Sequence, residues 1–167
     1  MTNCEAAVRR ANALLQDRTP LWTDCGALCG ARCCQGDENT GMHLLPGEGA
    51  LLRSPGFNVR QAGGEEYLIC EGRCARDMRP FSCRIFPFFP VPVRMRSGWY
   101  MIRVLPDPRA FSVCPLLTNE DVRFDRRFLR AVGRAGRALM RCEETAKWLI
   151  DTADELAEIA RLRDKLI

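Results

Sequence analysis

Apolar residues recur at helical spacing near both ends of the chain. Close to the N-terminus an apolar stripe on a polar background predicts an amphipathic helix over 2–17, which Pro20 ends. The stripe consists of Ala7, Val8, Ala11, Leu14 and Leu15. Towards the C-terminus, residues 119–142 and 143–167 show the same periodicity and few β-branched residues. We therefore expect two antiparallel helices there.

Two glycines, Gly133 and Gly136, lie inside the first of these C-terminal helices. Each glycine in a helix interior costs about 1 kcal/mol relative to alanine. Their presence indicates that another element approaches this helix closely.

The middle of the chain has shorter apolar segments that alternate with polar residues. Residues 57–60 and 66–70 predict two strands joined by a turn at residues 62–64. A β-hairpin is predicted over 91–105. Apolar and polar residues alternate over 91–95, a Ser-Gly turn follows, and residues 99–105 form an apolar segment.

A short helix is also expected over 44–52, because Pro46 suits the first position of a helix.

Helical and strand segments together predict an α+β fold. We expect a small, metal-organised domain with short strands and hairpins and a C-terminal antiparallel helical hairpin. No repeat or linker divides the sequence, so one domain over 1–167 is predicted, with a cysteine-rich region at 25–115 and a helical region at 118–167.

Composition indicates a globular protein, since 47% of the residues are hydrophobic. No apolar run approaches the roughly 18–20 residues of a membrane span, and residues 1–10 lack the apolar core of a secretory signal. We expect a cytoplasmic, reducing compartment and no membrane association.

In that compartment the ten cysteines favour metal or redox chemistry over disulfides. Cys4, far from the others, is interpreted as an ordinary thiol.

Eight cysteines crowd the middle of the sequence, four of them within residues 25–34. This crowding predicts a metal centre with thiolate ligands, because structural zinc and iron–sulfur clusters both take four thiolates. His43 is the single histidine, so imidazole contributes little. The candidate ligands are Cys25, Cys29, Cys33, Cys34, Cys70, Cys74, Cys83 and Cys114.

Eight thiolates suffice for two four-cysteine sites or for one site with spare thiols. Cys25, Cys29 and Cys33 have the spacing of one helix face, although the glycines between them also suit a loop around a metal. Neighbouring side chains diverge, so Cys33 and Cys34 serve two metals, or one of them is a ligand and the other packs behind it. The expected cofactor is an iron–sulfur cluster (4Fe-4S) or zinc, with a slight preference for the cluster.

The cysteine spacing resembles a known family. Three passages are similar to the YkgJ-like CxxCxxCC family of zinc- or iron-chelating proteins. They are Cys25-x3-Cys29-x3-Cys33-Cys34, Cys70-x3-Cys74 and Arg79-Pro80-x2-Cys83-Arg84-x-Phe86-Pro87. The cysteine-rich part of flagellin lysine N-methylase is also similar. The resemblance covers about residues 25–115 and implies eight metal-chelating cysteines. Three residues separate Cys29 from Cys33, where the family name implies two.

Arg79 and Arg84 flank Cys83 and are the candidate cofactor-contacting residues. Their guanidinium groups can donate hydrogen bonds to thiolates or sulfides and offset the negative charge of the centre. The nearby phenylalanines are predicted to form core under the hairpin and to keep water from the metal. They are Phe81, Phe86, Phe88 and Phe89.

A stripe of seven arginines follows helical spacing in the C-terminal third: Arg123, Arg126, Arg127, Arg130, Arg134, Arg137 and Arg141. Such a face binds phosphates or an acidic partner, or it is a solvated face paired with carboxylates of the last helix. We favour the second interpretation, because thiolate sites also offset the formal charge of +4. The pairing carboxylates would be Glu143, Glu144, Asp151, Asp154 and Glu155.

Catalytic motifs are absent from the sequence, which has no phosphate-binding Gly-rich loop, GxSxG or HExxH. We expect a cysteine-ligated metal protein with a structural, electron-transfer or accessory role, and no catalytic residue is assigned. Two alternatives remain open. One is a metal-dependent enzyme acting on a protein partner, and the other is a nucleic-acid or acidic-partner binder that uses the Arg123–Arg141 helix face.

Overall fold

The structure is a computed structural model that describes residues 3–35, 41–52, 58–69 and 78–165. Its long helices are α1 (Asn3–Leu15), α5 (Arg126–Leu139) and α6 (Glu143–Lys165), and its short ones are α2 (Cys25–Cys29), α3 (Glu48–Leu51) and α4 (Phe81–Ile85). The strands are β1 (Gly41–His43), β2 (Asn58–Ala62), β3 (Glu65–Ile69), β4 (Phe88–Arg94) and β5 (Tyr100–Pro106). The predicted α+β class is confirmed.

The two predicted hairpins are present in two antiparallel sheets, and the sequence did not predict β1, which pairs with β3. The first has the strand order β1-β3-β2, and its β2–β3 turn uses Gly63 and Gly64 at φ 61° and 84°. In the second, β4 pairs with β5 around a turn in which Gly98 adopts φ 84°. These positive φ angles favour glycine, which explains why each hairpin turns where it does.

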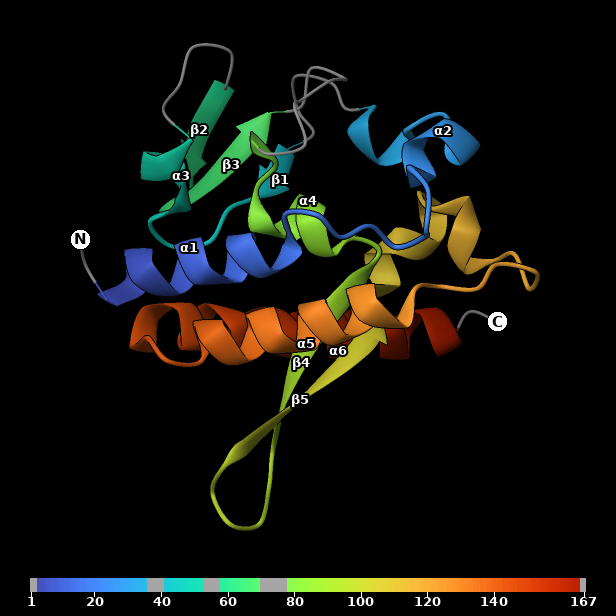
Figure 1. Ribbon diagram of the computed structural model, residues 1–167. Coiled ribbons are helices and arrows are strands. Elements are labelled where there is room, and N and C mark those ends of the chain that lie inside the picture. The colour runs from blue at the N-terminus through green and yellow to red at the C-terminus, as the bar shows by residue number, and fades with distance from the viewer. Residues whose placement is uncertain (1–2, 36–40, 53–57, 70–77, 166–167) are drawn as a thin grey trace.

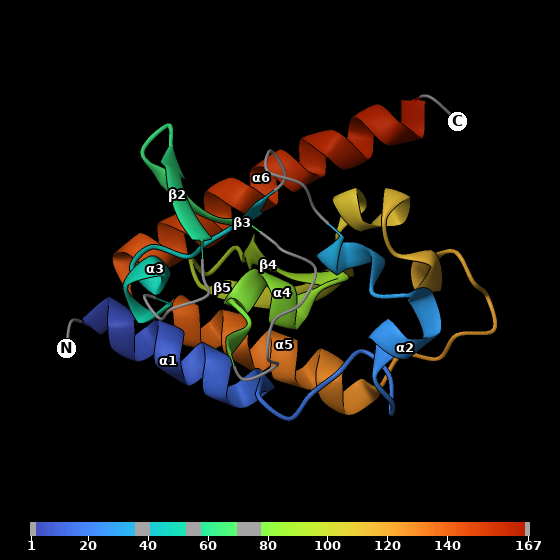
Figure 2. The ribbon, with the colours of Figure 1, turned by 90° about the horizontal axis from the view of Figure 1, so that it is seen from above.

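The hairpin β4–β5 starts between the C-terminal helices and extends well beyond them (Figure 1). Helices α5 and α6 meet at a short turn and diverge from it, with the base of the hairpin between them (Figure 2). The C-terminal helical hairpin is thus present, although its arms are wedged apart by β4. Helix α5 begins at Arg126, later than predicted, because the Asp125 side chain caps it by accepting a hydrogen bond from the Arg127 backbone N–H at 2.8 Å.

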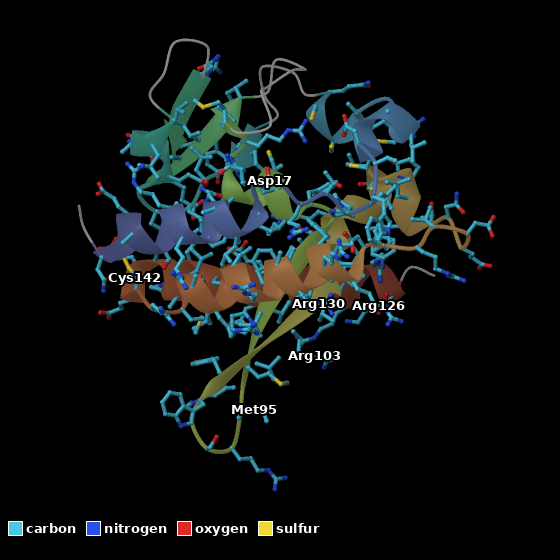
Figure 3. The ribbon with its side chains drawn as sticks, viewed as in Figure 1. Asp17, Met95, Arg103, Arg126, Arg130 and Cys142 are labelled. Carbon is cyan, nitrogen blue, oxygen red and sulfur yellow. A yellow bond between two sulfur atoms is a disulfide. The ribbon has the colours of Figure 1, made fainter. Side chains whose placement is uncertain are left out.

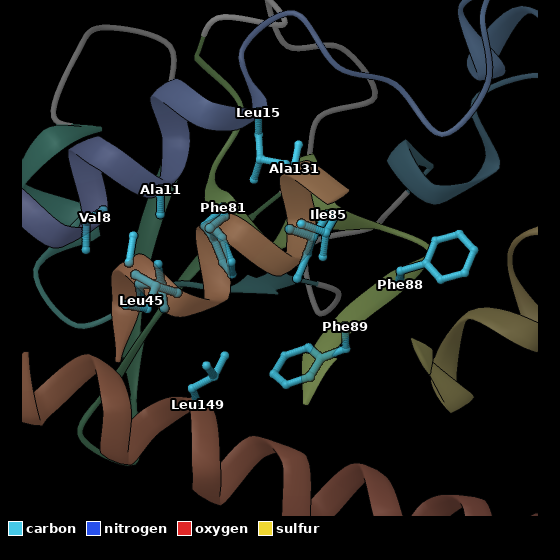
Figure 4. Close-up of a cluster of buried hydrophobic side chains, with 14 of the residues drawn as sticks. Val8, Ala11, Leu15, Leu45, Phe81, Ile85, Phe88, Phe89, Ala131 and Leu149 are labelled. Atoms are coloured by element: carbon cyan, nitrogen blue, oxygen red, sulfur yellow. The ribbon is translucent and has the colours of Figure 1, made fainter. Parts of the chain in front are cut away.

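The main hydrophobic core joins α1, α4, β4, α5 and α6 (Figure 4). Phe81, Phe89 and Phe128 are its largest fully buried side chains. Phe88 packs edge-on against Phe124, with ring centroids 4.8 Å apart. The prediction that these phenylalanines form core is therefore confirmed for Phe81, Phe88 and Phe89. Phe86, in contrast, is only half-buried and packs against a smaller cluster that contains Leu116.

Glu48 carries a buried carboxylate, 1% exposed, where α1, α3 and α4 meet. It accepts hydrogen bonds from the backbone N–H groups of Phe81, at 2.6 Å, and Leu45, at 3.1 Å, and from the Asn12 amide at 3.1 Å. Burial raises the pKa of Glu48, and the three hydrogen bonds oppose that shift. The carboxylate thereby fixes the start of α4 against α1.

Cys4 forms a disulfide with Cys142, with Cα atoms 5.3 Å apart. The interpretation of Cys4 as an ordinary thiol was therefore wrong. The bond ties the start of α1 to the turn between α5 and α6, across a sequence separation of 138 residues. Sequence could not reveal this pairing, because only the packing of α1 on α5 brings the two cysteines together.

The arginine face of α5 differs from the favoured interpretation. In the part of the chain that the structure describes, no ion pair joins the stripe to a carboxylate of α6. Asp151 pairs with Lys147 of its own helix. The expected arginine–carboxylate pairing is therefore wrong for the described residues. Strand β4 packs between α5 and α6 (Figure 2), and Glu143 and Glu144, at the turn between the helices, form no ion pair with the stripe in this part of the chain either.

The α5–hairpin contact predicts opposite effects for two substitutions in one helix. A Cβ at Gly136 would lie 2.7 Å from Pro90 Cβ and 3.1 Å from Ile102 Cγ2, whereas one at Gly133 would meet Val104 Cγ2 at 3.4 Å. Gly136→Ala should destabilise by about 1–3 kcal/mol through overpacking. Gly133→Ala should be neutral or stabilise by up to about 1 kcal/mol. Denaturant unfolding of the two variants and of the wild-type protein measures these changes in the free energy of unfolding. If Gly136→Ala were as stable as the wild type, the close contact between α5 and the hairpin would be contradicted.

The Glu48 carboxylate predicts a pH dependence of stability. Its pKa is raised in the folded protein above the ordinary value of 4.5, so its contribution is fully present below about pH 4.5 and is lost as pH rises through the higher folded pKa. Relative to Glu48→Gln, the wild-type free energy of unfolding should therefore fall with rising pH. Urea unfolding from about pH 4 to pH 8 measures this difference. The matched control is Glu120→Gln, at an exposed carboxylate; a similar pH slope there would contradict the assignment.

Candidate metal centre

Five of the predicted ligands line one small cavity of about 50 Å³. Since about 10–15 Å³ holds one water molecule, this cavity has room for more than a single water. The five come from separate stretches of the chain: Cys25, Cys29 and Cys33 from the first cluster, Cys83 from α4, and Cys114 from the loop after the second hairpin.

The first cysteine cluster is divided into two short turns. Asp24 caps α2 by accepting a hydrogen bond from the Gly26 N–H at 3.2 Å. The helix ends at Cys29 because Gly30 and Ala31 adopt left-handed conformations, with φ 64° and 52°. A 3-10 helix, Arg32–Cys34, follows. Cys33 therefore reaches the cavity from a second turn, and the prediction of one continuous helix face holds only for Cys25 and Cys29.

Cys83 and Cys114 are held by the protein interior on the opposite side. Cys83 lies on α4, whose first N–H is bound by Glu48. Cys114 is 7% exposed, and its backbone N–H donates to the Ala110 carbonyl at 2.7 Å. These two thiols are fixed by the core, whereas the first cluster lies on the surface side of the cavity.

Both predicted arginines lie at this cavity. Arg79 and Arg84 line it, and the Arg84 Nε–H donates to the Arg79 carbonyl at 2.6 Å. Arg18 is a third lining cation that the sequence did not single out. The remaining wall is apolar and is formed by Leu15, Pro20, Phe86, Pro87, Val113 and Leu116. The cavity is thus lined by cysteines, three arginines and apolar residues.

The adjacent pair Cys33 and Cys34 behaves as one unit, with sulfur atoms 4.0 Å apart. Their mutual hydrogen bond raises the pKa of Cys33, helped by burial and by the neighbouring thiols. The same bond, with the charge of Arg79, lowers the pKa of Cys34 to about 6 against the effect of burial. Cys33 lines the cavity and Cys34 does not appear among its walls.

Burial also raises the pKa of Cys114, and the charge of Cys29 adds to that shift. Thiolates that raise one another's pKa face a common space and repel when ionised together. A bound cation relieves this repulsion, because metal binding deprotonates its thiol ligands.

Cys70 and Cys74 lie outside the described residues. Within residues 3–35, 41–52, 58–69 and 78–165, no group of three or more potential ligands is arranged to hold a metal ion directly. The described thiols therefore surround a cavity rather than close on a single point.

A second, larger cavity of about 590 Å³ adjoins the first and shares Cys33, Phe86 and Val113 with it. His43 lies on its wall, stacked on Tyr67 with ring centroids 5.1 Å apart and with Nε2 3.4 Å from Glu65 Oε1. Trp148 Nε1 lies 3.4 Å from the same His43 nitrogen.

Sequence reasoning missed this group of side chains. Its members come from β1, β3 and α6 and converge only in the folded chain. Single residues of these types, far apart in the sequence, carry no signal that could have found them.

No protein-family model, no curated protein and no solved structure matches the chain. None of the helices in the part of the chain that the structure describes is both long and apolar enough to cross a membrane.

Proposed function

We propose that this protein binds a metal centre through the cysteines around the small cavity. The observation that carries the proposal is the convergence of Cys25, Cys29, Cys33, Cys83 and Cys114 on one space from three parts of the chain. Random burial of thiols does not explain why segments so far apart meet through the same residue type. Cys70 and Cys74, predicted from the family resemblance, complete the proposed ligand set together with Cys34.

An iron–sulfur cluster is the first candidate for the centre, and zinc is the second. A single zinc ion needs four ligands at about 2.0–2.3 Å in a tetrahedron. A cluster instead spreads its cysteine sulfurs around a larger body. Cysteines that line a shared cavity from several sides support the proposal of a cluster.

The surroundings of the cavity suit a negatively charged cluster. Arg18, Arg79 and Arg84 supply positive charge beside it, and guanidinium groups donate strong hydrogen bonds to anionic sulfur. The apolar wall limits access of water. A cluster bound here would supply one-electron chemistry, so the proposed role is electron transfer or an accessory function, with a protein partner to exchange electrons. The cytoplasmic location stays a prediction from the sequence, and the Cys4–Cys142 disulfide does not favour it.

A metal-dependent enzyme is the second candidate function, and the larger cavity favours it. That cavity reaches Cys33 and offers carboxylates and aromatic rings to a small molecule. An enzyme of this kind keeps one metal position open, whereas a structural site is closed by protein ligands.

Metal and acid-labile sulfide content of protein purified without oxygen tests the main proposal. Iron and sulfide in matching amounts, with visible charge-transfer absorption, are expected for the cluster. Cys29→Ser and Cys83→Ser should lose the metal and cooperative folding together, because binding energy is folding energy in such sites. Protein without metal would overturn the proposal, and a folded, fully metallated Cys29→Ser variant would remove that residue from the ligand set.

The matched control is the double variant Cys4→Ser/Cys142→Ser. It removes two cysteines that form a disulfide at the far end of α1, outside the residues that line the cavity. It should keep its full metal content even where its unfolding midpoint falls. Metal loss equal to that of Cys83→Ser would contradict the assignment of the centre to the cavity.

The second candidate predicts that the metal accepts an external ligand. Cyanide added to the cobalt-substituted protein should shift the visible absorption bands if a coordination position is open. Val113→Phe, at the wall common to both cavities, should reduce that shift by narrowing the approach. An unchanged spectrum at high cyanide would assign the centre to a closed, structural or electron-transfer role.

A further inference from the structure

Two neighbouring segments of this protein are strongly basic and contain no acidic residue. Residues 88–106, which form the β4–β5 hairpin, contain three arginines, and residues 126–142, which include α5, contain six. All nine arginines are exposed. The formal charge of the whole chain is only +4, so positive charge is concentrated on these segments.

Packing places the two segments side by side. Gly133 and Gly136 of α5 face Val104, Pro90 and Ile102 of the hairpin. Figure 3 shows Arg126 and Arg130 on α5, Arg103 on the strand beside them and Met95 farther along the hairpin. We define the exposed residues of 94–103 and 126–141 as the basic surface. Arg94 and Tyr100 lie opposite each other on the hairpin face that packs on α5, whereas Arg103 lies on the other face of the same hairpin.

Exposed aromatic rings accompany this charge. Trp99 is 79% exposed and Tyr100 41% exposed, both near the end of the hairpin. At the other end of α5, the Arg127 guanidinium lies 5.0 Å from the ring centroid of Trp22, which is 73% exposed. Two of the three tryptophans thus lie uncovered beside arginines, while Trp148 is buried.

The positive charge of this surface is not neutralised within the described chain. None of the nine arginines forms an ion pair with a carboxylate there. Helix α6, which carries acidic residues, runs along the other side of the hairpin base after the turn that joins it to α5 (Figure 2). A polyanionic partner is therefore the complement that this surface lacks.

We infer that the basic surface binds single-stranded nucleic acid. Arginines along α5 and the hairpin contact successive phosphates, because the guanidinium fork matches phosphate oxygens. Trp99 and Tyr100 offer flat faces on which unpaired bases stack, the arrangement by which single strands are held without sequence preference. The inference is independent of the metal centre.

An anionic membrane fits the hairpin less well. Its exposed apolar residues, Met95, Trp99 and Met101, are interspersed with Arg94, Arg96 and Arg103. Insertion of the tip would carry arginines towards the hydrocarbon region, where charged side chains are unfavourable. Phosphates of a nucleic acid contact the same arginines while they remain hydrated.

Fluorescence anisotropy with a labelled 20-nucleotide oligothymidine, measured over a salt series, tests the inference on the full chain as purified. Affinity should fall steeply with salt. Arg130→Gln/Arg134→Gln/Arg137→Gln should lower the slope of log affinity against log salt by about 2, since each phosphate contact on a single strand contributes about 0.7. Trp99→Ala should weaken binding about tenfold with little change in slope, because it removes stacking and no charge.

The matched control is Arg9→Gln/Arg10→Gln/Lys165→Gln, which removes three exposed positive charges outside the basic surface. It should leave the salt slope nearly unchanged. Loss equal to that of the α5 triple variant would overturn the surface assignment. Three outcomes would each overturn the single-strand inference. The first is no binding of oligothymidine at low salt, and the second is binding of duplex DNA with equal strength that Trp99→Ala leaves unchanged. The third is binding only to vesicles that contain phosphatidylserine.

Discussion

The buried carboxylate of Glu48 is the interaction on which the site depends. It joins α1 and α4 to α3 by hydrogen bonds from Asn12 and Phe81, and a third bond comes from the Leu45 N–H just before α3. A buried acceptor of this kind is expensive to leave unsatisfied, so the start of α4 is held firmly. Cys83 is the third residue of α4, and Arg79 and Arg84 lie on either side of it in the sequence. The polar cluster thus positions one wall of the cysteine cavity.

The cavity itself combines a rigid half and a surface half. Cys83 and Cys114 are set by core packing, whereas Cys25, Cys29 and Cys33 come from two short turns that little hydrophobic burial supports. Short turns with few buried apolar contacts have low local stability, so a ligand that binds them contributes a large part of it. A metal shared by both halves would therefore stabilise the first cluster most, which links the proposed ligand set to folding.

Charge is segregated across this molecule in a way that the net value hides. The hairpin base lies between α5 and α6 (Figure 2), and among the described residues no ion pair joins an arginine of α5 to a carboxylate of α6. The basic surface is consequently left without internal counter-charges in the described chain. The cysteine cavity and the basic surface are built from different parts of the chain, so one protein can carry both a metal centre and a polyanion-binding surface.

Sequence alone determined the three long helices, the two hairpins and the close approach at Gly136, because periodicity, turn glycines and helix propensity act locally; it did not predict the short helix α4. It also identified the cysteines and the two arginines of the cavity, since four thiols within ten residues are a strong chemical signal. Tertiary structure alone decided that Cys33 lines the cavity, that Cys4 pairs with Cys142 and that β4 separates α5 from α6. These features depend on which distant segments pack together, and that packing is set by the whole core rather than by any local pattern.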